Sequence, residues 1–529
     1  MPGRLLPLVM IMACGVPPAA RAPAPDAQPA AKAPGEGQLS ATAWLTRASL
    51  DLRGVRPSAA ELAAVAADPD AAEALILGFV DDARFADRAA WSWNDRLHTA
   101  LNFKSTTLRG YQALSDAQKE AAGFAPLALV AWIVAEDQPV TALVTNTTLP
   151  LNDDLAAAFG LTAPGRGAEW VMSAHQDARP PAGLLASTSL WLVVDGDATN
   201  HNRRRANAVS TMFLCEDFLS REAAFDFDLS VEELAAMEEA VRTQPACLTC
   251  HAGLDPLAAL FGGFAERSDQ AELSRLTVYS PWRAEWAMGW RAPAYFGRPV
   301  GNLSELGATL AADPRFGRCA ARTLAEGLIG EPLDDDELSP YHDALLNGGM
   351  SLRALARAIV TSERYRRDDE RALPIDALSS SLAQALGLSA EGETFLSLIW
   401  SLEHRRLGGG GDDHTAPDDV DEPGVGHALR DAWLARSVAE LALTQDADRA
   451  PEERILWIAG APYPTEEVAA RQVLVRWRQR LLSEQLSQSD PGVDQLWALW
   501  SAAGGAADPE AAWTTCLEAL LRHPMGRLY

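Results

Sequence analysis

The sequence predicts a mainly α-helical protein made of several modules, with little β-structure. Its hydrophobic share of 48% comes from Ala and Leu more than from Val, Ile and aromatic residues, and Ala and Leu lose little side-chain freedom in a helix. Helix-capping sequences precede apolar stretches of helical spacing. A length of 529 residues exceeds what one hydrophobic core usually serves, so several domains are expected.

The charge balance argues against a nucleic-acid partner. There are 72 acidic and 45 basic residues, which gives a formal net charge of −27. Binding to nucleic acid needs clustered Lys and Arg that displace phosphate counterions. The six cysteines are too few for a disulfide scaffold in a chain of this length.

Residues 1–14 are typical of an export signal. One basic residue, Arg4, precedes a short apolar run over residues 5–13, and Cys14 follows at once. The run is too short for a permanent membrane span. Residues 11–14 resemble a bacterial lipobox, which implies lipidation of Cys14 and a membrane-surface anchor. The alternative is an ordinary cleaved signal with an incidental cysteine.

A Pro/Ala-rich stretch over residues 15–40 follows the signal. It has too little apolar surface to offset the entropy of ordering, so we expect a tether. No later stretch has 18 uninterrupted apolar residues, and no transmembrane helix is expected. The predicted location is the periplasm or the cell surface of a bacterial envelope.

The N-terminal helical module is predicted over residues 41–135. Ser58 and Glu61 have the spacing of a capping box and start a helix after Pro57. The core residues expected in this module are Trp91, Trp93 and Leu97.

A second module is predicted over residues 136–235. The apolar run over residues 187–195 predicts one of the few strands. A second capping box, from Ser230 to Glu233, starts a helix that Pro245 should end.

The rest of the chain again has helical patterns. They define a closing module over residues 291–370 and a C-terminal helical region over residues 371–529, which contains an acidic, Gly-rich loop at 408–426. The predicted helices are 304–330, 351–363, 374–386, 393–406, 427–443 and 465–488.

The clearest chemical motif lies in the segment 236–290. Cys247, Cys250 and His251 form the pattern C-x-x-C-H, in which two thiols can bind the vinyl groups of one haem and the histidine its iron. Three alternatives stay open: a zinc site, which would need further ligands, a redox disulfide, and a surface motif without a cofactor.

The order of motifs resembles the Planctomycete-type cytochrome c domain proteins, large exported bacterial proteins of several helical modules. Residues 246–257, ACLTCHAGLDPL, are similar to the cytochrome motif of that family and its Asp-Pro-Leu exit. The other similar stretches are residues 45–61, 152–160, 183–185, 202–205, 213–215 and 293–366. The resemblance implies that Cys247 and Cys250 are the thioethers of one haem c and that His251 is the proximal ligand.

The resemblance does not supply a sixth iron ligand. Met288 is a candidate, within a stretch that holds Trp282, Trp286 and Trp290. As a helix, this stretch would carry the tryptophans on one side and Met288 roughly on the other; only an extended form would place all four on one face. An aromatic stripe is more often core. The rival ligands are His175 and His201, and the iron could also be five-coordinate.

Three cysteines lie outside these motifs. Cys215 and Cys319 could form a bridge in an oxidising compartment, although sequence alone does not decide the pairing. Cys516 stays unassigned.

The expected function is that of an exported, membrane-tethered monohaem c-type cytochrome-like protein, active in one-electron transfer or as a redox module with an unnamed redox partner. The alternative is a structural or binding lipoprotein without a catalytic haem. Whether the chain is an enzyme stays open: the sequence has no hydrolase or dehydrogenase motif, and a haem enzyme would need an open iron site.

Overall fold

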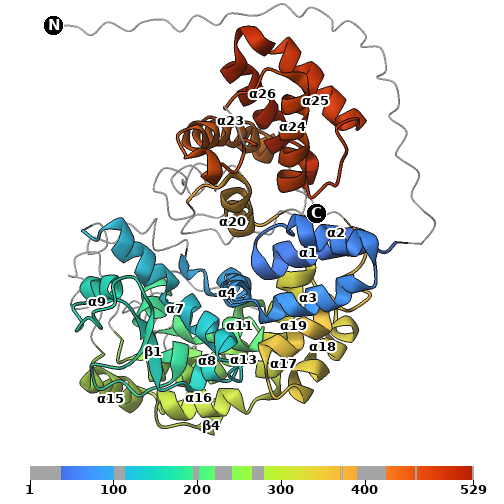
Figure 1. Cartoon of the computed structure of the whole chain (residues 1–529). Helices are drawn as coiled ribbons and strands as arrows, with labels where there is room; N and C mark the ends of the chain where they lie inside the picture. Colours follow the sequence, from blue (N-terminus) through green and yellow to red (C-terminus); the bar gives the residue numbers. More distant parts are fainter. Residues whose placement is uncertain are drawn as a thin grey trace, which may run out of the picture.

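The computed structural model describes residues 37–100, 113–194, 202–220, 241–264, 279–369, 371, 373–389, 425–458 and 462–526. The predicted features outside these residues are Cys14 with its signal, residues 15–36 of the tether, His201, the capping box at Ser230, the helix 393–406 and residues 408–424 of the acidic loop. The described chain is mainly helical, as predicted. Figure 1 shows the helices after residue 373 gathered in one group and the earlier elements in another.

The first group begins with the helices of the N-terminal part of the chain. They are α1 (Ala41–Arg53), α2 (Ala59–Ala67), α3 (Ala71–Asp81), α4 (Arg84–Leu97), α7 (Asp116–Ala135), α8 (Ala142–Thr145), α9 (Asp153–Phe159), α10 (Thr188–Val193) and α11 (Arg203–Leu214). The capping box is confirmed at the start of α2, where Ser58 accepts from the Glu61 amide and Glu61 from the Ser58 amide. Trp93 and Leu97 are buried and Trp91 is half-buried against the same core.

The group continues through the C-x-x-C-H segment to the closing helices. Its remaining helices are α13 (Pro245–Ala258), α15 (Pro281–Trp290), α16 (Leu303–Ala311), α17 (Pro314–Ile329), α18 (Asp335–Asn347) and α19 (Leu352–Val360). The predicted helix 304–330 is thus two helices, which part where Asp313 caps α17 and Pro314 takes its first position. One hydrophobic core runs through this group from Trp44 to Tyr365. The helix α9 instead packs in a smaller cluster with the first half of α7.

Strands are few and short. Among the described residues, β1 (Thr148–Leu151) pairs antiparallel with β2 (Val171–Ala174), and β3 (Ala294–Tyr295) with β4 (Arg298–Pro299). The strand predicted at 187–195 is wrong, because Ser187 caps the helix α10 by accepting from the Leu190 amide. A short buried apolar run fits a helix as well as a strand, and here the cap decides.

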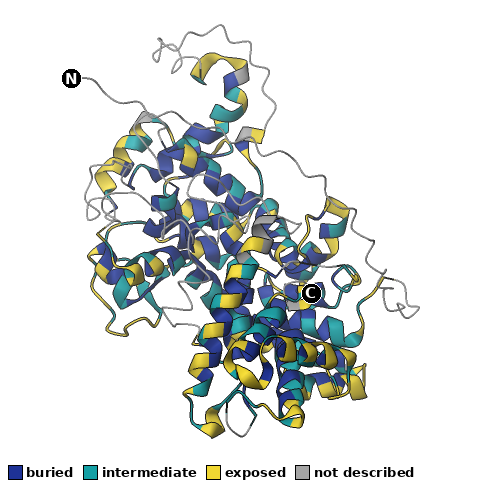
Figure 2. Ribbon diagram, turned by 90° about the horizontal axis from the view of Figure 1, so that it is seen from above, coloured by how far each residue is buried: buried dark blue, intermediate teal, exposed yellow. Residues whose placement is uncertain are grey.

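The second group contains the C-terminal helices. They are α20 (Ile375–Leu386), α23 (Val425–Ala447), α24 (Glu467–Leu482), α25 (Pro491–Ala502) and α26 (Pro509–Leu521). The sequence patterns do not predict α18, α25 or α26. These helices surround a second core, whose centre holds Trp457, Trp477, Trp500 and Trp513. In Figure 2, ribbon coloured as buried lies inside both groups.

Side chains from the start of the chain join the two groups. The buried Arg56 donates to the hydroxyl of Ser483 at 3.2 Å and to the carbonyl of Met525 at 2.8 Å. Arg88 of α4 forms an ion pair with Asp376 of α20. The C-terminal helices therefore pack on the N-terminal ones through buried polar contacts.

The last residues of the predicted tether are part of the folded body. Gln38 forms a β-bridge with Arg367, and the Asp368 amide donates to the Gly37 carbonyl at 2.9 Å. Ser40 then caps α1 by accepting from the Ala43 amide. Residue 37, where the described chain begins, thus lies beside the end of the closing module.

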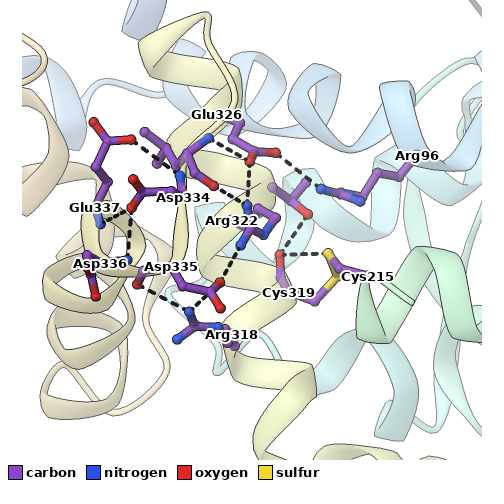
Figure 3. A network of polar contacts seen from close by, with 12 residues as sticks. Arg96, Cys215, Arg318, Cys319, Arg322, Glu326, Asp334, Asp335, Asp336 and Glu337 are labelled. Atoms are coloured by element: carbon purple, nitrogen blue, oxygen red, sulfur yellow. Dashed lines mark hydrogen bonds and ion pairs between the residues drawn. A yellow bond between two sulfur atoms is a disulfide. The ribbon is translucent and has the colours of Figure 1, made fainter. Parts of the chain in front are cut away.

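A disulfide joins Cys215 and Cys319, the pairing that the sequence left open. It lies beside a network of ion pairs between α17 and the start of α18, in which Arg322 contacts Glu326 and Asp335 (Figure 3). No helix among the described residues is long and apolar enough to cross a membrane.

Candidate functional site

The C-x-x-C-H residues lie in the helix α13. Residues 241–243 are also helical, so the predicted helix before Pro245 does end there, and Pro245 itself takes the first position of α13. Residues three and four apart lie on one side of a helix. The helix therefore brings Cys247, Cys250 and His251 to one side, with Asp255 one turn beyond His251.

A short hydrogen bond holds the His251 ring. Its Nδ1 lies 2.9 Å from Oδ1 of Asp255, which is 2% exposed, while the His251 side chain is 22% exposed. The bond uses one ring nitrogen and leaves Nε2 as the second. Metal-binding histidines commonly have such a carboxylate on the nitrogen that does not bind the metal.

Two arginines hold the Asp255 carboxylate. Arg203, the first residue of α11, donates to both oxygens at 2.7 and 3.1 Å, and Arg291, just after α15, donates to Oδ2 at 3.3 Å. Burial alone would raise the pKa of Asp255, but hydrogen bonds from His251 and Arg203 and the charge of Arg203 outweigh it and lower the pKa to about 2. Asp255 is therefore a carboxylate at neutral pH.

The two thiols are free and partly covered. Cys247 is 7% exposed, and Cys250 is half-buried with its Sγ 3.4 Å from the carbonyl of Phe218. They are not joined to each other. Among the described residues, no group of three or more His, Cys, Asp or Glu side chains is arranged to hold a metal ion.

Neighbouring elements fix α13 in place. Helix α11 packs along it, and α15 packs on η3 (Ala259–Phe261), the short turn that continues it. A side chain at Gly262 would come within 2.2 Å of the Ala287 side chain, and one at Gly263 within 2.1 Å of the Tyr279 ring. The two glycines thus permit the close approach that brings Arg291 to Asp255.

The segment with Met288 forms the helix α15, so its extended alternative is wrong. Trp282 and Trp286 are 70% and 63% exposed, which corrects the expectation of a buried aromatic stripe. Met288 is half-buried against the first core, on a different side of the helix. Its role as a distal ligand stays a prediction. The Trp290 side chain lies outside the described part of the structure.

Of the rival ligands, His175 follows β2 and His201 lies outside the described residues. The His175 Nε2 atom is buried and has no hydrogen-bond partner among the described residues. Burial and the nearby charge of Arg179 lower the pKa of His175 to about 4, so its ring is neutral at physiological pH. A neutral imidazole is the form that binds metals.

The chain was compared with protein-family models, curated proteins and solved structures. No protein-family model, curated protein or solved structure matches the chain.

The residues present fit a covalently attached haem. Two free thiols share one side of a helix with a histidine whose Nδ1 is already bonded. The sequence predicted these three residues but missed the supporting roles of Asp255, Arg203 and Arg291. The four-residue spacing of His251 and Asp255 could have indicated the first; the two arginines are 52 and 36 residues from Asp255 and meet it only in the folded chain.

Proposed function

We propose that this chain is an exported, membrane-tethered protein that carries one covalent haem c and acts in one-electron transfer or as a redox module. One observation carries the proposal: α13 sets Cys247, Cys250 and His251 on one side, and a buried carboxylate holds the imidazole through Nδ1. The motif order that resembles the Planctomycete-type cytochrome c domain proteins supports it.

Each residue of the site has a distinct role in this proposal. Cys247 and Cys250 would form the thioethers, and Nε2 of His251 would bind the iron. A bound haem supplies one-electron chemistry at its iron. Asp255 orients the ring, Arg203 helps to keep the pKa of Asp255 low, and both Arg203 and Arg291 hold its carboxylate in place.

The disulfide between Cys215 and Cys319 supports an exported location. Disulfides persist in oxidising compartments such as the periplasm and are rare in the cytosol. Lipidation of Cys14 would hold the body to a membrane surface. The redox partner stays unnamed, and the net charge of −27 gives no reason to expect nucleic acid.

A binding or structural lipoprotein is the second candidate, and the C-terminal group of helices favours it. None of its described residues takes part in the contacts of His251 and Asp255. A cleft of about 510 Å³ lies between it and α4, lined by Arg84, Trp91 and Gln384 among others. Ligand sites often lie between domains.

The two candidates differ in whether the purified protein carries haem. The chain is expressed with its signal in a host that matures c-type cytochromes, and the denatured protein is tested for a haem band on a gel and by absorption. We expect one haem per chain that survives denaturation and disappears in Cys247→Ala/Cys250→Ala. A Cys516→Ala variant, changed at a buried cysteine outside the motif, should keep it. Colourless wild-type protein would refute the proposal and favour the second candidate.

A further inference from the structure

We infer that Asp255 is a positioning residue for the proposed haem site: it holds His251 in one orientation and one tautomer, with Nε2 as the ligand atom. The inference rests on the proposed function. Its basis is the 2.9 Å contact between Nδ1 of His251 and Oδ1 of Asp255, one helical turn apart in α13.

The carboxylate is itself fixed by three elements. It belongs to α13, Arg203 reaches it from the start of α11, and Arg291 reaches it from the end of α15. Arg203 donates to both of its oxygens, a geometry that fixes the carboxylate plane. With 2% of its side chain exposed, Asp255 has little room to turn. The imidazole is thus bonded to a group that cannot follow a rotation of the ring.

The same contacts decide which ring nitrogen carries the proton. Arginine side chains can only donate hydrogen bonds, and Arg203 and Arg291 between them donate to both oxygens of Asp255, so the carboxyl group is the acceptor in these contacts. The Nδ1–H group of His251 must therefore be the donor of the hydrogen bond to Asp255. In a neutral ring Nε2 then has a free lone pair, which is what binding to a metal requires.

The contacts around Asp255 also predict whether substitutions at this site raise or lower the midpoint potential of the haem. A carboxylate on Nδ1 makes the ring a stronger electron donor, which favours the oxidised metal. Arg203 also donates hydrogen bonds to this carboxylate and partly neutralises its charge, which weakens the effect of the carboxylate on the ring. Loss of the Asp255 charge should therefore raise the midpoint potential, and loss of Arg203 should lower it.

A haem-independent measurement tests the tautomer. In full-length protein labelled with ¹⁵N-histidine, the wild-type His251 signals should be those of a ring protonated at Nδ1. In Asp255→Asn this preference should be lost, because an amide can donate as well as accept. The matched control is Asp313→Asn. Asp313 also accepts hydrogen bonds from an arginine, Arg315, and from the hydroxyl of Tyr295, but its side-chain donors among the described residues include no histidine. It should leave the His251 signals unchanged.

Measurements on the haem-bearing protein complete the test. We expect Asp255→Asn to raise the midpoint potential and to lower the iron–histidine stretching frequency in resonance Raman spectra, with Asp313→Asn unchanged in both. The inference is overturned, and the proposed function left intact, if Asp255→Asn keeps the wild-type His251 tautomer in haem-free protein and the wild-type potential and stretching frequency in haem-bearing protein. If Asp255→Asn does not accumulate, Arg203→Gln decides: a lowered potential supports the inference and an unchanged one overturns it. Colourless wild-type protein would refute the proposed function, and the inference with it.

Discussion

Cys215, at the end of α11, and Cys319, within α17, are bonded to each other across 104 residues of sequence, with their Cα atoms 5.3 Å apart. The bond closes a loop that contains the whole C-x-x-C-H segment. It also ties α11, which supplies Arg203 to the candidate site, to the closing helices that share its core.

Removal of this disulfide should destabilise the protein. A loop of this length restricts the unfolded chain, and its loss costs roughly 2–5 kcal/mol. We expect Cys215→Ser/Cys319→Ser to lower the free energy of unfolding in urea by that order. Reductant should lower it to a similar extent in wild-type protein and have no effect on the double variant. Equal stability of the oxidised wild type and the variant would contradict this prediction.

Arg205 should be important for stability because its buried guanidinium joins three segments. It is 1% exposed and donates to the carbonyls of Trp191, Val194 and Phe264. Arg205→Met would leave these buried acceptors unpaired, so we expect a loss of about 3 kcal/mol or more in urea unfolding.

Two variants serve as comparisons for Arg205→Met. Arg205→Lys should lie between it and the wild type, because an ammonium group cannot reproduce the planar fork. Arg204→Met changes the neighbouring, exposed arginine and should cost much less. Similar losses for Arg204→Met and Arg205→Met would contradict the role assigned to Arg205.

Acid should remove the contribution of Asp313. Burial would raise the pKa of this residue, but hydrogen bonds from Arg315 and Tyr295 outweigh it and lower the pKa from 3.8 to about 2. A lowered folded-state pKa stabilises the protein above the unfolded-state pKa, and the gain is lost as the pH falls from about 4 to 2.

Asp313→Asn tests this pH dependence. The variant should be less stable than the wild type at pH 6, by about 1 kcal/mol given the partial exposure of the ion pair. The difference should shrink as the pH falls below 4, as measured by the thermal unfolding midpoint of both proteins. A difference that stays constant down to pH 2 would contradict the linkage.

Local sequence signals predicted much of the fold. The capping box at Ser58 and the Pro245 break act within a few residues of sequence, and both are present in the structure. The helix α10 was mistaken for a strand because a short apolar run has no period that separates the two. The environment of His251 could be predicted only in part: Arg203 and Arg291 reach Asp255 through tertiary packing, which no local pattern encodes.

Tryptophans in the two groups of helices should differ sharply in their contribution to stability. Trp513 is fully buried, its indole N–H donates to the Pro464 carbonyl at 3.1 Å, and its ring centre lies 5.1 Å from that of Trp477. Trp513→Ala would leave a large cavity and should cost about 3–5 kcal/mol. Trp282→Ala/Trp286→Ala changes two side chains that are mostly exposed, and surface changes usually cost within about 0.5 kcal/mol.

Urea unfolding followed by far-ultraviolet circular dichroism measures both effects. We expect the Trp513 variant to unfold at clearly lower urea and the double variant to unfold with the wild type. The comparison is informative because the double variant removes two indoles and the single variant only one, so the number of aromatic groups lost predicts the opposite order. A large loss of stability in the double variant would mean that Trp282 and Trp286 are covered in the folded protein, contrary to their exposure here.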